Sequence, residues 1–486
     1  MMKKQLQILI SFFLFALLFS SCKKENEQSN SEQPNIVVIL CDDLGYGDLS
    51  SYGHTTIQTP NLDGLAGKGI KLTNYYSAAP VCSPSRVGLL TGRSPNRAGV
   101  YDFIPGPKKS EDLRDLVHLQ AHEETIPAML KTVGYSTCLS GKWHCNSRFN
   151  SEAQPKPSHF GFDHWFATHN NAAPSHENPK NFIRNGEDVG EIEGFSCQIV
   201  VDEAMSWLES KDSDNPFYLQ VCFHEPHEPI ASPKELVDKY LPSSETENQA
   251  QYFANVENMD KAVGRLLEYL EKNHGENTLI VFSSDNGPET LNRYSRAKRS
   301  YGSPGELKGM KLWTNEAGFR VPGIVYWMGK ETFSGTSDAV VSGLDFLPTF
   351  AEVSGAALPQ RTLDGESFTP LFGQGEFVRT KPLVWSFYNA LNDHVVAMRD
   401  GDWKIMAMLK NDTTYLSKIY NLYDGNEAFV KEAELTDFVL YDMKNDKSET
   451  ADVASKYPNV FDEEKSRLKD EYEKLLEGSF IWKREK

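Results

Sequence analysis

Two pairs of neighbouring oxygen donors in this 486-residue chain have the residue types of a metal site. Asp42 and Asp43 directly follow one apolar run, and Asp285 and Asn286 follow another. Three carboxylates and an amide oxygen suit a hard divalent cation, with Ca²⁺ the first choice and Mg²⁺ the second. A turn or a helix cap uses the same residue types. We predict a cation site because both pairs stand where a predicted strand ends.

The run that starts at Cys82 is the most informative stretch of the chain. It reads Cys-Ser-Pro-Ser-Arg from Cys82 to Arg86 and continues to Thr91-Gly92. An isolated cysteine is usually a buried thiol. This run, however, resembles the signature that formylglycine-generating enzymes read in type I sulfatases, a branch of the alkaline-phosphatase-like superfamily. The resemblance implies that Cys82 is oxidised to formylglycine after translation.

The resemblance also implies a reaction, the hydrolysis of a sulfate ester by a sulfuric ester hydrolase. The formylglycine at position 82 would hydrate, and the cation would polarise or ionise one hydroxyl, which attacks sulfur. The second hydroxyl then eliminates sulfate and restores the aldehyde, a step that a serine cannot perform. By the same resemblance, Cys82 in its converted form joins Asp42, Asp43, Asp285 and Asn286 as a metal ligand.

Five further side chains take catalytic roles from the resemblance. Arg86 would hold the formylglycine hydroxyl, and Lys142 would hold a sulfate oxygen. His144 is the expected base of the elimination, and His227, with Lys311 nearby, is the expected general acid for the leaving alcohol. Each alone has an ordinary structural explanation. Together they would hold a tetrahedral oxyanion beside a divalent cation.

The likeness covers most of the chain after its N-terminal segment and is greatest to the lipoprotein sulfatases of glycan-degrading bacteria. Besides the cysteine run, the stretches that carry it are 45–48, 59–63, 141–144, 226–229, 307–311, 316–322, 345–349 and 363–365. One position departs from the family pattern, because Ala317 stands where the family usually has the first of two glycines.

Apolar runs predict the elements that must position these residues. Residues 35–40, 217–223 and 277–282 are continuous runs of the kind that parallel strands buried on both faces show. Residues 198–209 and 256–272 carry apolar residues at helical spacing. Alternating strands and helices predict an α/β fold with ligands beyond the carboxyl ends of the strands. With the resemblance, this predicts an alkaline-phosphatase-like sandwich whose large, mostly parallel central sheet is flanked by helices.

A smaller antiparallel sheet and a helix are predicted near the C-terminus. Residues 383–387 and 395–398 have strand patterns, and Asp400-Gly401 marks a tight hairpin. Residues 459–476 form a charged amphipathic stretch that is typical of a surface helix. We therefore expect a C-terminal subdomain that is distinct from the catalytic domain.

The N-terminus is predicted to be a targeting segment. Lys3 and Lys4 precede an apolar run at 8–19 that is too short to span a membrane. Small residues then lead to Cys22, which resembles a bacterial lipobox and implies lipidation, with simple secretion as the alternative. We expect an exported lipoprotein of the bacterial cell envelope, periplasmic or on the cell surface. The predicted segments are a signal peptide at 1–21, a lipidated polar tether at 22–34, a catalytic domain at 35–370 and a C-terminal subdomain at 371–486.

The composition restricts the partners of the chain. A net charge of −18 argues against a nucleic-acid-binding surface. A sulfated substrate is itself an anion, so the site must gather cations inside an acidic exterior. Apart from Cys22 and Cys82, five cysteines lack the spacing of a disulfide framework or a zinc site, although Cys138 and Cys145 could pair.

The substrate is the least specific part of the prediction. Residues 166–171 and 176–178 form a polar stretch that either reads sugar hydroxyls or is a surface loop. We hypothesise that His169, Asn171 or His176 contacts the sugar. The resemblance implies a sulfated polysaccharide or oligosaccharide, with galactose or N-acetylgalactosamine units as examples. It also implies a formylglycine-generating or anaerobic sulfatase-maturating enzyme as a partner.

Two other functions remain open at this point. A phosphohydrolase of the same superfamily would need a serine or threonine nucleophile and histidine-rich paired zinc ligands, and neither is evident in the sequence. A catalytically silent, glycan-binding surface lipoprotein would carry an unconverted Cys82. Metal content separates the first alternative from a sulfatase, and the mass of the Cys82 peptide separates the second.

Overall fold

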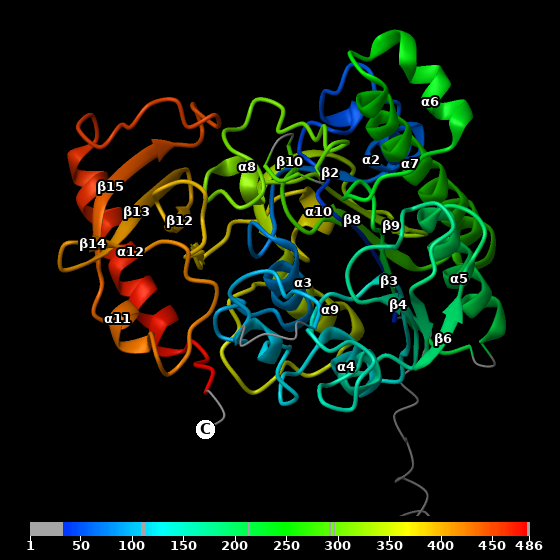
Figure 1. Cartoon of the computed structure of the whole chain (residues 1–486), viewed down its shortest axis with the longest axis horizontal. Helices are drawn as coiled ribbons and strands as arrows, with labels where there is room; N and C mark the ends of the chain where they lie inside the picture. Colours follow the sequence, from blue (N-terminus) through cyan, green and yellow to red (C-terminus); the bar gives the residue numbers. More distant parts are fainter. Residues whose placement is uncertain (1–32, 108–112, 212–213, 291–292, 296, 484–486) are drawn as a thin grey trace, which may run out of the picture. The chain divides into compact units, whose positions relative to one another are not determined.

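A ten-stranded sheet with the strand order β10-β2-β9-β8-β1-β7-β3-β4-β5-β6 forms the centre of the fold (Figure 1). The computed structural model describes residues 33–107, 113–211, 214–290, 293–295 and 297–483. The predicted signal peptide, Cys22 and the tether up to residue 32 lie outside the described residues. Residues from Pro34 onward belong to one unit of the chain, so the boundary expected at residue 370 stays a prediction.

The middle of the sheet consists of the three apolar runs that the sequence predicts as strands. They are β1 (Asn35–Cys41), β7 (Phe217–Cys222) and β8 (Thr278–Ser284). β1 pairs in parallel with both neighbours. The other strands of this sheet are β2 (Ile70–Tyr76), β3 (Ser136–Lys142), β4 (His164–Thr168), β5 (Phe182–Arg184), β6 (Glu187–Gly190), β9 (Gly323–Met328) and β10 (Gly335–Ser342).

The sheet is mixed rather than uniformly parallel. Of the nine pairings between its described strands, five are parallel and four are antiparallel. The parallel core holds the strands that lead to the predicted site. Antiparallel pairs involve β9 between β8 and β2, and β5 and β6 at one edge. The predicted large central sheet is therefore confirmed, but it is more mixed than expected, because β9 inside the sheet and β5 and β6 at one edge pair antiparallel.

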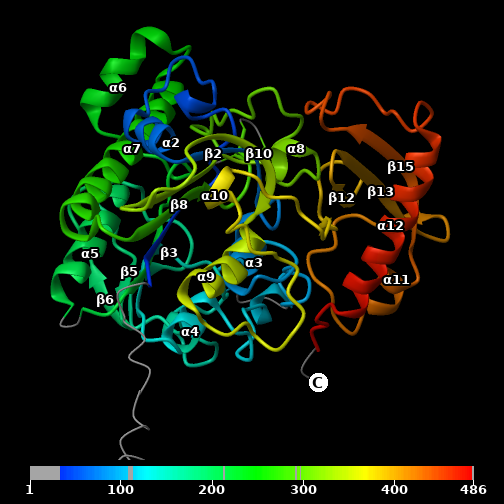
Figure 2. The same cartoon turned by 180° about the vertical axis from the view of Figure 1, so that it is seen from behind.

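Alternate residues of β1 face two different apolar cores, as side chains of a strand must. Val37 and Ile39 belong to one core, and Ile36 and Val38 to the other. Helices cover both cores and so flank the sheet on both faces (Figure 2). On the first face lie α2 (Pro60–Lys68), α5 (Ser196–Ser210), α6 (Lys234–Tyr240) and α7 (Glu247–His274); on the second lie α3 (Cys82–Thr91), α4 (Ile126–Lys131), α9 (Phe346–Ser354) and α10 (Leu371–Gln374).

A second, antiparallel sheet follows, as the sequence predicts. It has the order β11-β12-β13-β14, and β15 pairs with β13. Gly401, with φ of 49°, lies in the two-residue connection between β12 and β13, which confirms the predicted hairpin. The elements are β11 (Leu383–Ser386), β12 (Val396–Asp400), β13 (Trp403–Asn411), β14 (Thr414–Tyr415), α11 (Glu427–Lys431), β15 (Glu434–Asp442) and α12 (Pro458–Glu477).

The α12 helix lies on this small sheet and is more than a surface helix (Figure 1). Leu468, Tyr472 and Leu476 pack into the apolar core under the sheet. No helix among the described residues has the length and apolar content needed to cross a membrane. The six described cysteines are buried free thiols, so Cys138 and Cys145 do not form a disulfide here.

A buried glutamate on α12 predicts a pH dependence of stability. Glu464 is 7% exposed, and burial together with nearby Asp400 raises its pKa from 4.5 to about 7. Between these two values the folded state holds a proton that the unfolded state has lost, so the free energy of unfolding falls as pH rises. Glutamine does not titrate, so Glu464→Gln should not show this fall in the free energy of unfolding. We expect the variant to gain about 1–3 kcal/mol relative to wild type between pH 4 and pH 8 in urea unfolding.

The exposed Glu473 on the same helix is the matched control. Glu473→Gln should follow the wild-type pH profile of the free energy of unfolding. Identical pH profiles for Glu464→Gln and wild type would show that Glu464 titrates alike in the folded and unfolded states, contrary to this prediction.

Candidate active site

The two acidic pairs meet at one end of the central sheet because the strands before them are neighbours. β1 and β8 run parallel with Cys41 opposite Ser284, so the residues after both strands leave the sheet side by side. Asn286 Nδ2 donates to Asp43 Oδ1 at 2.7 Å, and the backbone N–H of Asp43 donates to Asp285 Oδ1 at 3.3 Å. All four predicted ligands are buried.

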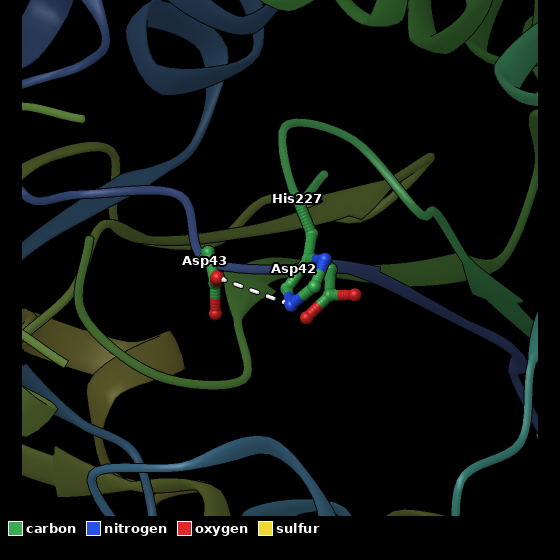
Figure 3. A group of neighbouring side chains, drawn as sticks. All are labelled: Asp42, Asp43 and His227. Carbon is green, nitrogen blue, oxygen red and sulfur yellow. Dashed lines mark ion pairs between the residues drawn. The ribbon is translucent and has the colours of Figure 1, made fainter. Parts of the chain in front are cut away.

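Cys82, the first residue of α3, lies in this acidic cluster. Its Sγ and the carboxylate oxygens of Asp42 and Asp285 lie within 4.8 Å of one another. A second group with the same spacing consists of Asp42, Asp43 and His227, and Figure 3 shows the imidazole between the two carboxylates. Burial raises the pKa of the Cys82 thiol. An unconverted Cys82 is therefore a neutral thiol and a poor nucleophile.

The cluster has unsatisfied oxygen atoms that a cation would satisfy. Asp42 Oδ1 and Asn286 Oδ1 are buried and have no hydrogen-bond partner among the described residues. Buried acceptors without partners are costly. Burial also raises the pKa of Asp285 to about 7, although Arg86 lowers it. The residues present therefore fit a hard divalent cation, whose charge would favour the ionised carboxylates.

Each carboxylate of the cluster also pairs with a buried cation from another part of the chain. Without an ion the three pairs are neutral, and a divalent cation would leave the centre with two positive charges. That positive charge suits an anionic substrate. It explains how a protein with a negatively charged surface can bind a negatively charged sulfate ester. The pairs are Lys142 Nζ–Asp42 Oδ2 at 2.6 Å, Lys311 Nζ–Asp43 Oδ1 at 2.7 Å and Arg86 Nη2–Asp285 Oδ2 at 2.7 Å.

The ring of His144 is held in the form that accepts a proton. Its Nε2 lies 2.8 Å from the carbonyl oxygen of Ile104. Because a carbonyl only accepts, Nε2 carries the ring proton and Nδ1 has a free lone pair. Nδ1 is buried and has no hydrogen-bond partner among the described residues. Burial and the charge of Lys142 lower the pKa of His144, which keeps the ring neutral.

The two groups expected to protonate the leaving alcohol differ in the protons they carry. His227 Nδ1 lies 2.5 Å from the carbonyl oxygen of Glu228, and Nε2 lies 3.6 Å from Asp43 Oδ2. Burial lowers the pKa of His227 to about 4, so its Nε2 is unprotonated at pH 7. Burial opposes the charge on Lys311, but Asp43 raises the Lys311 pKa. Lys311 is therefore the protonated member of the two groups at pH 7, and the role of His227 as general acid stays a prediction.

A cavity of about 740 Å³ opens onto these groups. Its volume lies within the range of about 300–1,000 Å³ that is usual for ligand pockets. A second hollow of about 890 Å³, near Arg97 and Lys474, contains none of the predicted site residues. The side chains that line the cavity include Cys82, His144, His227 and Lys311, and also Phe103, Asn170, Asn171, Arg293, Tyr294 and Leu312.

The three residues predicted to contact a sugar have different positions. Asn171 lines the cavity, and its predicted contact with a sugar stays a prediction. His169 packs its ring against His144 with centroids 5.5 Å apart, and its Nε2 lies 2.7 Å from a backbone carbonyl oxygen. His176 is fully buried and lies 3.1 Å from Asn255 Nδ2. The expectation of a sugar contact does not hold for His176, because tertiary packing makes it a core histidine.

The fold has room for the methyl group of Ala317, where the family motif usually has a glycine. The next residue, Gly318, has no room for a side chain. Ala317 is buried in a small apolar cluster with Tyr46 and Leu307. A Cβ on Gly318 would lie 1.8 Å from the carbonyl oxygen of Trp313, which is a severe clash. Only the second of the two positions therefore needs a glycine in this chain.

The loop that carries Lys311 is anchored to the small sheet by a buried ion-pair cluster. Lys404 Nζ, on β13, lies 3.0 Å from Glu316 Oε1 and 2.7 Å from Glu449 Oε1. Glu449 Oε2 in turn accepts from the backbone N–H of Glu316 at 2.8 Å and from Asn315 Nδ2 at 3.0 Å. No motif in the sequence singles out Lys404 and Glu449, which lie far along the chain from Lys311.

Comparison with known families gives two matches that together cover most of the described chain. The model described as Sulfatase matches residues 34–356. The model described as N-sulphoglucosamine sulphohydrolase, C-terminal, matches residues 310–476.

Individual proteins show the same similarity. N-acetylgalactosamine-6-sulfatase of Homo sapiens is 32% identical over 365 residues, which cover 71% of this chain and 67% of that protein. Arylsulfatase A of Homo sapiens is 33% identical over 396 residues, which cover 76% of this chain and 74% of that protein. The crystal structure of Ps i-CgsB in complex with k-i-k-neocarrahexaose has a TM-score of 0.74 at 27% identity and covers 93% of this chain and 95% of that one.

Proposed function

Because the chain belongs to the sulfatase family of sulfuric ester hydrolases, we propose that it hydrolyses sulfate esters on carbohydrates with a formylglycine made from Cys82. The observation that carries this proposal is the position of Cys82 in a buried cluster of carboxylates and cations at the base of a cavity. The named relatives support a carbohydrate substrate, since one is an N-acetylgalactosamine-6-sulfatase and another binds a neocarrahexaose.

We propose that Asp42, Asp43, Asp285 and Asn286 hold a divalent cation, with Ca²⁺ first and Mg²⁺ second. The support is the all-oxygen donor set with two buried, unpaired oxygens. When bound, such a cation supplies Lewis acidity that stabilises negative charge on oxygen. The donor set lacks the histidine-rich ligands of a paired zinc site, which disfavours a phosphohydrolase.

The converted side chain at position 82 supplies two hydroxyls on one carbon as its hydrate, one to attack sulfur and one to expel sulfate. Arg86 Nη1 donates to the Lys142 carbonyl at 3.1 Å and so ties α3 to the end of β3 beside this residue. Lys142 and Lys311 face the negative charge that develops on the sulfate oxygens.

Proton transfer is divided between His144 and Lys311, which both line the cavity. His144, with Nδ1 free and neutral, takes the proton of the second hydroxyl as sulfate leaves. Lys311 holds the proton that the leaving alcohol needs, and neutral His227 lies beside the same carboxylate, Asp43. The amides of Asn170 and Asn171 on the cavity wall are positioned for sugar hydroxyls.

Sulfate release from a panel of singly sulfated hexoses tests this function. The protein is produced together with a maturating enzyme, and the mass of the Cys82 peptide is measured to confirm the exchange of sulfur for oxygen. We expect release that falls at least about 100-fold after chelation and returns with Ca²⁺. Full activity of metal-free protein contradicts the cation assignment, and converted protein that releases no sulfate from any sulfated glycan contradicts the proposed function.

We also propose that the chain is an exported bacterial lipoprotein whose lipid is attached at Cys22. The support is the apolar run and the small residues before Cys22. The mass of the N-terminal peptide from the native host tests it. An acylated Cys22 at the N-terminus is expected, and an unmodified N-terminus at another residue contradicts the proposal.

A further inference from the structure

One arginine in the cavity wall and a second one behind a lining residue have no role in the reaction described above. Arg293 lines the cavity directly. Arg114 stacks its guanidinium over the ring of Phe103, which also lines the cavity, at 5.3 Å from the ring centre. In a chain with a net charge of −18, cations at the mouth of an anion-binding cavity suggest that more than one anionic group is recognised.

Arg293 is held rigidly and still has one edge available. Its Nε lies 2.7 and 2.8 Å from the two carboxylate oxygens of Glu289, and Nη2 also pairs with Glu289. Its Nη1 has no hydrogen-bond partner among the described residues. The Glu289 side chain is 3% exposed and that of Arg293 is 25% exposed, so the carboxylate is the deeper member and the guanidinium faces the cavity.

The neighbouring ring completes a flat surface beside this edge. The Arg293 guanidinium lies 4.7 Å from the ring centre of Tyr294, which lines the same cavity. A guanidinium fixed by a carboxylate and an aromatic ring loses little conformational entropy when it binds. Such an edge suits a sulfate or carboxylate group, which accepts charge-assisted hydrogen bonds from planar N–H donors.

A second guanidinium packs against aromatic rings beside Phe103. Arg114 lies between Phe103 and Tyr420, with its guanidinium 4.5 Å from the ring centre of Tyr420. Tyr420 is 42% exposed. Aromatic faces that remain accessible beside a cavity can pack against the apolar face of a sugar ring.

Buried Asp102, the neighbour of Phe103 in the chain, is close enough to both arginines to be affected by their charges. Its carboxylate accepts from the backbone N–H of Phe103 at 2.7 Å and from Asn389 Nδ2 at 2.9 Å. Burial raises the pKa of Asp102 to about 7, while the charges of Arg114 and Arg293 both lower it. Positive charge from two arginines therefore acts on the residue next to Phe103 in the chain.

We propose that Arg293, with Tyr294 and Phe103, forms a second anion subsite for an acidic sugar that adjoins the sulfated one. This inference rests on the proposed function and specifies its substrate class as a glycan with a sulfate or carboxylate on the neighbouring sugar. Lys142 and Lys311 would hold the sulfate ester that is cleaved. Arg293 would bind the sulfate or carboxylate on the neighbouring sugar, which is not cleaved. The enzyme then selects multiply charged glycan chains over isolated sulfated sugars.

The test compares disaccharides that differ only in the neighbouring sugar. The hexose sulfate that wild type cleaves best is joined to a neutral hexose, to a hexuronic acid or to a second sulfated hexose. We expect kcat/KM of wild type to be at least about tenfold higher for an acidic disaccharide than for the neutral one, mainly through KM. The two acidic arms show whether carboxylate or sulfate is preferred.

Arg293→Gln should reduce this preference to about twofold or less, and Arg293→Lys should restore part of it. Because Arg293→Gln leaves Glu289 unpaired, the double variant Glu289→Gln/Arg293→Gln removes both charges and keeps the loop neutral. Arg265→Gln on α7 is the matched control, since Arg265 also pairs with a carboxylate, that of Asp202, but is remote from the cavity lining. The control should keep the wild-type preference.

Equal kcat/KM of wild type for neutral and acidic disaccharides would overturn the subsite. A preference that persists in both Arg293→Gln and the double variant would overturn it as well. Failure of the proposed function gives a different result, because converted wild type would then release no sulfate from any of the three disaccharides.

Discussion

Replacing Cys82 by serine is expected to lower kcat for sulfate release by at least about 10³-fold, as loss of a catalytic nucleophile does. A serine has one hydroxyl on its β-carbon and can at most attack sulfur once. In the proposed mechanism, the hydrated aldehyde at position 82 has a second hydroxyl on the same carbon, and loss of its proton expels sulfate. His144 Nδ1 then has no proton to take in the variant, because that hydroxyl is missing. Steady-state sulfate release with the best hexose sulfate measures the effect.

The fold should tolerate this change, which separates loss of chemistry from loss of structure. Serine is similar in size to cysteine, and Cys82 is at the end of a helix rather than in its interior. Cys197→Ser is the matched control, because Cys197 Sγ accepts from Asn258 Nδ2 at 3.2 Å and a hydroxyl can accept the same bond. We expect near wild-type melting for both variants and near wild-type activity for the control only. Turnover at the wild-type rate by pure Cys82→Ser would refute the formylglycine mechanism.

The fold was predictable from the sequence where burial on two faces leaves a continuous apolar run. Residues 35–40 and 277–282 become β1 and β8 because every side chain of a central parallel strand is buried. The start of α7 was less predictable. The helix begins at Glu247 rather than at residue 256, after a cap in which the Thr246 side chain accepts from Gln249 N–H. The first turns of α7 are rich in polar residues, so the helical spacing of its apolar residues is not recognisable in that part of the sequence.

The predictability of the site follows from how its residues are positioned. Asp42 and Asp285 could be placed together because each directly follows a central strand, and neighbouring strands end side by side. Arg293 and Tyr294 lie further along the connection after β8, beyond the residues that the end of the strand positions and without any apolar period, so only the folded chain places them at the cavity. His176 shows the opposite error, since a polar sequence context predicted exposure and tertiary packing buried the ring.

Replacing Lys404 by methionine is expected to cost about 3–5 kcal/mol of unfolding free energy, the usual effect of removing one partner from a buried ion cluster. Lys404 is fully buried between the carboxylates of Glu316 and Glu449. Burial opposes ionisation of Glu316, but Lys404 and Arg320 lower its pKa to about 2. Without Lys404, the buried carboxylates of Glu316 and Glu449 lose a positively charged partner. Urea unfolding with far-UV circular dichroism measures the loss.

A control variant and a compensating second substitution show whether Lys404→Met loses stability through an unpaired buried charge or through lost packing. Lys410→Met lies on the same strand at a less buried position and should cost less than about 1 kcal/mol. Lys404→Met/Glu449→Gln removes the unpaired charge, and the glutamine oxygen can still accept from Asn315 Nδ2 and the Glu316 N–H. The double variant should therefore regain about 1–2 kcal/mol over Lys404→Met.

The same cluster links stability to catalysis. Asn315 and Glu316, at the start of the short helix α8 (Glu316–Phe319), directly follow the loop that carries Lys311, and Lys311 pairs with Asp43 at the reaction centre. Loosening the anchor at Lys404 should therefore lower kcat of the protein that remains folded by about tenfold, with a smaller change in KM. Folded Lys404→Met with wild-type kcat would show that contacts nearer to Lys311, such as its backbone N–H to the Pro288 carbonyl at 2.9 Å, suffice to position it.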